Sequence, residues 1–159
     1  MMGIALSTAG VQVKYAVESV KGTRPTTGYK TIPDIKEVPE MNPEPETLES
    51  TTLAETEYKT YIAGLKDLGG ALSFLANHTE ELMTQWDELL TVFKEAKKED
   101  KAVWFDIVHP GLTKTVSFKG EPSAMGLPQM GVSSVLETNL YITPINEPKW
   151  YPKVVEQES

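Results

Sequence analysis

The sequence predicts a mainly β protein of the α+β class with a single α-helix. Several short stretches alternate apolar and polar residues with a period of two, which is typical of strands that bury one face. Proline and glycine clusters separate these stretches, and only one segment, Thr79–Lys97, has apolar residues at helical spacing. A chain of 159 residues with 40% hydrophobic content can bury one core. We therefore predict a single domain over residues 1–149, followed by a polar C-terminal tail over residues 150–159.

The N-terminal third is predicted to hold one regular strand and then irregular ones. Apolar and polar residues alternate over Val11–Val17, whereas Ser19–Lys30 has the glycine, proline and threonine content of an exposed loop. Ile32–Thr52 contains four prolines, and proline removes a hydrogen-bond donor from a sheet. We therefore expect a proline-broken hairpin of short strands there.

Thr51–Leu68 shows neither clean alternation nor a helical stripe. A connection this long that carries apolar side chains is normally functional, because those side chains need a partner. The apolar residues concerned are Leu53, Tyr58, Tyr61, Ile62 and Leu65. A strand is expected next, with Leu68, Gly70, Leu72, Phe74 and Ala76 on one face.

The predicted helix has consistent ends as well as a consistent apolar face. Asn77 or Thr79 can cap its N-terminus, acidic residues occupy the first turn, and lysines occupy the last turn. The apolar stripe comprises Leu82, Trp86, Leu89, Leu90, Phe93 and Ala96. Its aromatic residues indicate core packing rather than a cofactor site.

The C-terminal half is predicted to continue as strands. Val103–Val108 and Lys114–Phe118 flank the turn sequence His109–Gly111 and so predict a β-hairpin. Glu121–Gly131 is expected to be a flexible connection into a long final strand. In that strand one face would carry Val132, Leu136, Leu140 and Ile142, and the other Ser133, Glu137, Asn139 and Thr143.

The residues needed for catalysis or metal binding are scarce. The chain has no cysteine and only two histidines, His78 and His109, which do not form a catalytic triad or a metal-binding spacing. Neither a Walker sequence nor a dinucleotide-binding glycine pattern is present. We therefore expect no enzyme activity, no catalytic residue, no metal and no cofactor. Without a secretory signal or a run of about 20 apolar residues, no membrane association is expected either.

Charge is the most informative feature of the composition. The formal net charge is −8, which argues against a protein that wraps nucleic acid by neutralising phosphates. Acidic residues gather in the middle of the chain, with only Lys36 and Lys59 nearby to balance them. These acidic residues are Glu37, Glu40, Glu44, Glu46, Glu49, Glu55 and Glu57. Such a surface either serves solubility or lets polyanions pass without binding them.

Two stretches, Ile32–Leu53 and Glu57–Gly70, contain the short sequences Ile-Pro-Asp-Ile, Glu-Ser-Thr-Thr-Leu and Gly-Leu-Lys-Asp. Their order, with one helix, a hairpin and a terminal strand after them, resembles the major tail tube proteins of long, non-contractile bacteriophage tails and their prophage relatives. The resemblance extends from about Gly10 to Ile145. It implies a β-sandwich or partial barrel with one flanking helix. Six copies would form a ring with a continuous inner β-barrel, and rings would stack into a tube. Contractile inner tubes and the type VI secretion tube protein share that fold.

The resemblance also implies a function and partners. The tube would conduct the DNA genome to the host cell during ejection, without binding it specifically. Partners would be other copies of the chain, a tape-measure protein, a tail-tip or initiator protein and a tail-terminator protein. The protein would belong to the virion tail and be assembled in the host bacterial cytoplasm.

By the same resemblance, the Thr51–Leu68 loop would reach an adjacent subunit or ring through Leu53, Tyr58, Tyr61, Ile62 and Leu65. Glu49, Thr51, Glu137 and Asn139 are the residues expected to face the lumen, because each lies on a polar face opposite an apolar one. The alternative is a monomeric or dimeric β-rich module that binds carbohydrate or peptide. Trp150 and Tyr151 would then form an exposed aromatic platform, although they could equally pack the terminus against the sheet.

Overall fold

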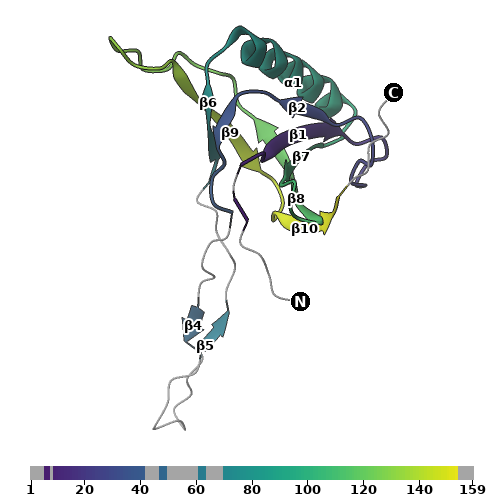
Figure 1. The fold of residues 1–159 in the computed structure, drawn as a ribbon. Coiled ribbons are helices and arrows are strands. Elements are labelled where there is room, and N and C mark those ends of the chain that lie inside the picture. The colour runs from purple at the N-terminus through teal and green to yellow at the C-terminus, as the bar shows by residue number, and fades with distance from the viewer. Residues whose placement is uncertain (1–5, 8, 42–46, 50–60, 64–69, 154–159) are drawn as a thin grey trace, which may run out of the picture.

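A computed structural model describes residues 6–7, 9–41, 47–49, 61–63 and 70–153 (Figure 1). Its main feature is an eight-stranded antiparallel sheet with the strand order β2-β1-β7-β8-β9-β6-β3, in which β10 also pairs with β8. The strands are β1 (Gln12–Val17), β2 (Lys30–Ile32), β3 (Ile35–Glu37), β6 (Leu72–Asn77), β7 (Val103–Val108), β8 (Lys114–Pro122), β9 (Glu137–Pro144) and β10 (Lys149–Pro152). A separate two-stranded sheet joins β4 (Thr47–Glu49) to β5 (Tyr61–Ala63).

The eight-stranded sheet curls into a partial barrel because its two end strands are neighbours in the sequence. Only Pro33 and Asp34 separate β2 from β3, although these strands lie at opposite ends of the strand order. The three residue steps from Ile32 to Ile35 span at most about 11 Å, so the two ends of the sheet must lie close together. Asp34 makes the turn with a positive φ of 64°. The predicted mainly β fold with a partial barrel and one helix is confirmed.

The helix α1 (Glu80–Lys98) covers one end of the barrel (Figure 1). Thr79 caps its N-terminus, where the side-chain oxygen accepts a hydrogen bond from the Leu82 amide at 3.1 Å. Leu82, Trp86 and Leu89 are fully buried against the concave side of the sheet. The sheet contributes Val13, Tyr15, Phe74, Val103, Phe105, Phe118, Leu140 and Ile142 to the same core. The predicted helix and its apolar stripe are confirmed, with bounds shifted by one residue.

Most predicted strands are present, but the proline-rich segment pairs differently from the prediction. The hairpin of β7 and β8 pairs Phe105 with Phe118. Strand β1 alternates as predicted only as far as Tyr15, because Ala16 is also buried. The described residues of Ile32–Thr52 do not pair with one another as a hairpin. Instead β3 pairs with β6 and β4 pairs with β5, so each short strand takes its partner from later in the chain. Leu72, Phe74 and Ala76 share a buried face of β6 as predicted, whereas Leu68 lies outside the described residues.

The predicted final strand is too long at its N-terminal end. Strand β9 begins at Glu137, and the side chain of Val132 is 98% exposed. The reason is a turn at this point, where Ser133 has a φ of 67° and the Ser134 amide donates to the Gly131 carbonyl. From Glu137 onward the predicted faces are correct, with Leu140 and Ile142 buried.

Residues 150–152, which we placed in the polar tail, belong to the sheet. Trp150 and Tyr151 lie in β10 and pair with Val116 and Thr115 of β8. The predicted boundary between residues 149 and 150 therefore falls inside a strand.

Candidate assembly surfaces

A polar face covers the outer side of β3, β6 and β9, and it carries two of the four predicted lumen residues. Thr138, Leu140 and Ile142 of β9 are buried, so Asn139, Tyr141 and Thr143 point outward. Glu137 forms an ion pair with Lys36 of β3 at 2.7 Å, and Ser73 of β6 donates to the Asn139 side-chain oxygen at 3.3 Å. Because Lys36 offsets the charge of Glu137, this face is polar rather than strongly acidic.

The other two predicted lumen residues are Glu49 and Thr51, and only Glu49 lies among the described residues. Glu49 ends β4 and pairs with Tyr61 in the two-stranded sheet, whereas Glu137 and Asn139 belong to the eight-stranded sheet. Thr51 lies outside the described residues. The structure therefore supports one polar face on β9 and does not bring Glu49 to it.

The predicted inter-ring loop contains an element that sequence patterns did not reveal. Tyr61 and Ile62 lie in β5, which pairs antiparallel with β4. Leu53, Tyr58 and Leu65 lie outside the described residues. Figure 1 draws the two-stranded sheet below the barrel, and its strands are not hydrogen-bonded to the eight-stranded sheet.

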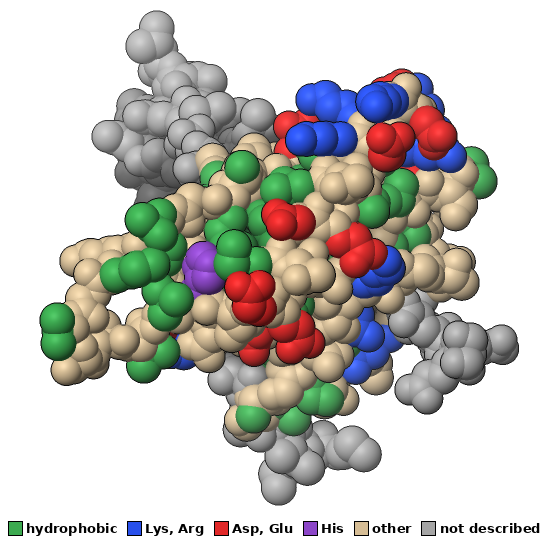
Figure 2. Space-filling model, turned by 90° about the horizontal axis from the view of Figure 1, so that it is seen from above, with side chains coloured by type: hydrophobic (Ala, Val, Ile, Leu, Met, Phe, Trp, Pro, Cys, Tyr) green, Lys and Arg blue, Asp and Glu red, His purple; other side chains and the backbone are tan. Residues whose placement is uncertain are grey.

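A second exposed surface is an apolar arm, residues 124–136, between β8 and β9. Sequence reasoning treated its first half as a connection and its second half as a strand. Met125 packs against the core, but four other large apolar side chains face solvent: Leu127 (84% exposed), Met130 (59%), Val132 (98%) and Val135 (68%). The arm contains no charged residue, although 24% of the residues in the whole chain are charged. This lack of charge is the feature by which the arm could have been recognised in the sequence. Figure 2 shows hydrophobic side chains along the projection at the left, on the side where Figure 1 draws this segment.

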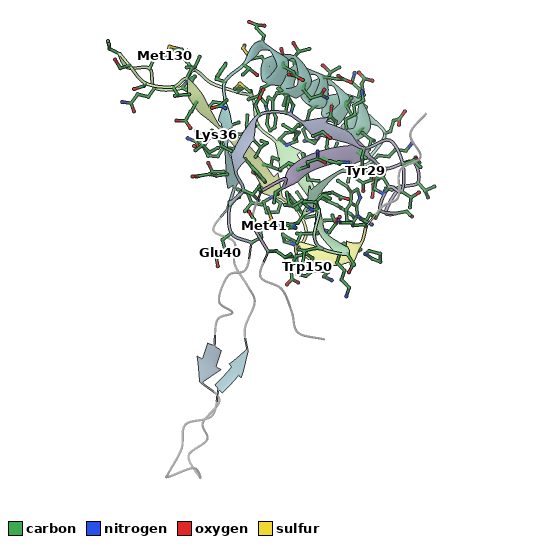
Figure 3. All side chains as sticks on the ribbon, viewed as in Figure 1. Tyr29, Lys36, Glu40, Met41, Met130 and Trp150 are labelled. Atoms are coloured by element: carbon green, nitrogen blue, oxygen red, sulfur yellow. The ribbon has the colours of Figure 1, made fainter. Side chains whose placement is uncertain are left out.

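An apolar groove of about 350 Å³ lies between β7, β8, β10 and the segment that follows β3. It is lined by Val38, Pro39, Met41, Ile107, Val116, Pro148 and Trp150. Trp150 is 59% exposed. Figure 3 shows Met41 and Trp150 on the lower side of the barrel, far from Met130 at the end of the arm.

A buried polar cluster beneath β10 holds the groove wall in place. The Arg24 guanidinium forms an ion pair with Asp106 at 2.8 Å, donates to Ser117 at 2.9 Å and donates to the Pro152 carbonyl at 3.2 Å. It also lies over the Tyr151 ring, 4.9 Å from the ring centre. Burial raises the pKa of Asp106, although hydrogen bonds from Ser117 and the charge of Arg24 oppose that rise. This cluster fixes β10 and hence the position of Trp150.

Tyr151, the second residue of the suggested aromatic platform, packs against the sheet. Its ring meets that of Trp104 edge-on, with the centres 5.9 Å apart, and it is only partly exposed. Trp150 alone therefore presents an aromatic surface at this position.

His109 makes contacts through its ring, whereas His78 makes one through its backbone amide. The His109 ring accepts a hydrogen bond from the Gly111 amide at 2.9 Å and contacts the Ser7 carbonyl, and the His78 amide donates to the Leu136 carbonyl. Among the described residues, no three histidine, cysteine or acidic side chains gather closely enough to hold a metal ion. Within that same part of the chain, no helix combines the length and the apolar character that crossing a membrane requires.

Comparison with known proteins finds similarity in fold rather than in sequence. No protein-family model matches the chain, and no curated protein matches its sequence. The fold is similar to that of a chain in the cryo-EM structure of the anti-feeding prophage baseplate, determined with six-fold symmetry. The TM-score is 0.55 at 15% sequence identity, and the match covers 96% of this chain and 98% of that chain. At this identity the similarity establishes a shared fold.

Proposed function

We propose that the protein is a structural subunit of a phage-type tail tube. Six copies form a ring, rings stack into a hollow tube, and the tube conducts the DNA genome to the host cell. The observation that carries the proposal is the fold shared over nearly the whole length of both chains with a component of a phage-like baseplate.

The open ends of the partial barrel support assembly into a ring. Strands β2 and β3 each pair with one neighbour in the described structure, so each leaves one edge available. Exposed strand edges tend to pair with other chains unless they are covered. A ring would give each edge a partner from the next copy, and the inner strands of the copies would together form a barrel too wide for one chain to close.

The polar face of β3, β6 and β9 is the part of the described structure best suited to line the tube. Its hydroxyl and amide groups, with a neutralised Glu137–Lys36 pair, offer no cluster of free cations to bind phosphates. Glu137 and Asn139 thus remain our candidates for the lumen. Glu49 and Thr51 remain candidates on sequence grounds alone.

Other partners follow from the proposed role. Tube assembly needs a tail-tip or initiator complex, a tape-measure protein within the lumen and a terminator at the far end. The protein would then lie in the virion tail, after assembly in the host cytoplasm.

The proposal is tested by concentrating the purified protein and examining it by negative-stain electron microscopy and light scattering. Rings or hollow tubes are the expected result, because exposed edges and the apolar arm favour self-association. The same sample is then mixed with tail-tip and tape-measure proteins. A protein that stays monomeric in both settings would contradict the proposal.

The exposed Trp150 favours a second candidate, a β-rich binding module. Tryptophan beside an apolar groove can stack on a sugar or a peptide side chain. A glycan array and a thermal-shift screen separate the two functions. A saturable ligand that raises the unfolding temperature of a monomer would favour the module, whereas particles formed without ligand would favour the tube.

A further inference from the structure

We propose that the apolar arm of one subunit docks into the apolar groove of a second copy in the next ring. This inference rests on the proposed tube function and identifies two surfaces that would join its rings. It concerns described residues only and does not depend on the two-stranded sheet of β4 and β5, which we call the β4–β5 hairpin.

The arm has the chemistry of an interface. Leu127, Met130, Val132 and Val135 are all more than half exposed within one short segment. Soluble monomers rarely expose a contiguous apolar surface of this kind unless it binds something. In a neutral, proline- and glycine-containing segment, no charged side chain has to be desolvated when this surface is covered.

The groove has a compatible chemistry, with apolar side chains beside some polar atoms of the backbone and the Trp150 indole. All seven of its lining residues are apolar, and none carries a charge. Its volume of about 350 Å³ can receive side chains such as leucine and methionine. The fixed position of β10 means that the groove already exists before anything binds, so little ordering is needed.

A second copy is the occupant that the geometry favours. Figure 3 places Met130 and the groove residues Met41 and Trp150 at opposite ends of the subunit, so an arm cannot reach the groove of its own chain. A projection at one end that fits a hollow at the other makes a head-to-tail contact, which repeats without closing and produces a stack.

Charge supports the same pairing. Each copy has a net charge of −8, so copies repel one another over most of their surfaces. Contact through two uncharged surfaces avoids placing like charges together. The arm and the groove meet that condition on opposite ends of the same molecule.

Disulfide trapping tests the contact, because the chain has no cysteine of its own. One variant carries Met130→Cys on the arm and the other Met41→Cys in the groove. The two are mixed at high concentration, oxidised and separated on a non-reducing gel, while electron microscopy records whether tubes are present. Met83→Cys, an equally conservative change at a half-exposed position on α1, replaces the arm variant in the control. We expect at least tenfold more mixed disulfide from Met130→Cys than from Met83→Cys.

The outcomes separate this inference from the proposed function. Mixed disulfide together with tubes supports both, and tubes without mixed disulfide overturn the arm-to-groove contact while leaving the tube function standing. Mixed disulfide without rings or tubes supports the contact and contradicts the tube. Absence of both, with the tail-tip and tape-measure proteins also present, contradicts both.

A second pair of variants tests the energetic role of the arm without cross-linking. Val132→Asp places a charge on the arm at a 98% exposed position, where it should not disturb folding. Val20→Asp makes the same change in an exposed loop outside both surfaces. We expect Val132→Asp to raise the protein concentration needed for stacking at least tenfold and Val20→Asp to leave it unchanged. Equal concentrations for the two variants would overturn the proposal.

Discussion

At the scale of single residues, Glu18 shows how a buried carboxylate can stabilise the barrel. Its two oxygens accept hydrogen bonds from the Ala102 amide at 2.8 Å and from the Trp104 indole at 3.0 Å, and the residue is 3% exposed. Burial by itself raises the pKa of Glu18, but these hydrogen bonds, with one from the Gly22 amide, outweigh it and lower the pKa below the ordinary value. The charged form is therefore favoured by folding, and it ties the end of β1 to the start of β7.

We predict that Glu18→Gln lowers the free energy of unfolding by about 1–3 kcal/mol near neutral pH. The glutamine side chain has only one acceptor oxygen, so its NH2 group would face one of the N–H groups that donate to the Glu18 carboxylate. Since folding lowers the pKa, the contribution of Glu18 is present above the unfolded pKa and is lost as the pH falls through the folded pKa. The difference between wild type and variant should therefore shrink in acid. Urea unfolding at about pH 7 and about pH 3 measures it. Glu147→Gln, at an exposed position, is the control, and equal losses for the two variants would contradict the assignment.

Glu137 tests the proposed lumen. Glu137→Lys replaces an ion pair with two lysines, because Lys36 stays in place. We expect assembled particles to release DNA several-fold more slowly, since each added cation on the lumen can pair with a phosphate. Release is followed by the fluorescence of a dye that binds the emerging DNA. Glu95→Lys makes the same charge change on the exposed side of α1. Identical release rates for the two variants would remove Glu137 from the lumen.

At the scale of the strand, Gly120 allows β8 to pass close to the core. A Cβ atom at this position would lie 2.7 Å from Cγ2 of Ile142 and 3.1 Å from the rings of Phe105 and Phe118. We predict that Gly120→Ala destabilises the fold by about 1–3 kcal/mol, because a packed core must shift to admit the methyl group. Gly126→Ala in the arm is the matched control, since nothing lies within 4 Å of its Cβ position. Equal denaturation midpoints for the two variants would show that the core adapts at Gly120.

Elements that depend on local signals were predictable from the sequence. The helix has a cap, charged ends and a six-residue apolar stripe, and all of these act within a few residues. The β7–β8 hairpin likewise follows from a turn between two β-branched and aromatic stretches. The ends of each of these elements are determined by residues close to them in the sequence.

Pairing between distant strands was not predictable in the same way. The choice of β6 as partner for β3 is set by the closure of the barrel, and the short proline-containing segments do not encode it. Val132 and Leu136 fit a period of two with Leu140, so they indicated a strand, yet the turn at Ser133 breaks the extended conformation. Alternation within β9 was enough to predict that Glu137 and Asn139 lie on its outer face. It could not show that Glu49 belongs to a different sheet, because sheet membership depends on pairing between distant strands.

At the scale of the whole molecule, the barrel and the β4–β5 hairpin are distinct units of hydrogen bonding. Strands β4 and β5 pair with each other and not with the eight-stranded sheet. The barrel core is drawn from the eight-stranded sheet, α1 and a few flanking side chains. Deleting the hairpin should therefore affect contact with neighbouring subunits without preventing the subunit from folding.

We predict that deleting Leu53–Leu65 leaves the subunit folded and prevents it from stacking. The deletion removes β5, which contributes no hydrogen bond to the main sheet, so the thermal midpoint should change by less than that of Gly120→Ala. Stacking should be lost because the apolar side chains proposed to reach the adjacent ring are removed with the segment. Circular dichroism measures the midpoint, and electron microscopy with light scattering measures tube formation.

Tube formation by the deletion variant is compared with tube formation by Val132→Asp, which changes the arm and leaves the β4–β5 segment intact. If the hairpin and the arm both join rings, each change alone should leave single rings or monomers with an intact fold. Long tubes from the deleted protein, combined with none from Val132→Asp, would assign ring stacking to the arm and groove and would contradict the role proposed for the hairpin. The reverse result would assign stacking to the hairpin, because the apolar contact between arm and groove would then be too weak to hold two negatively charged rings together.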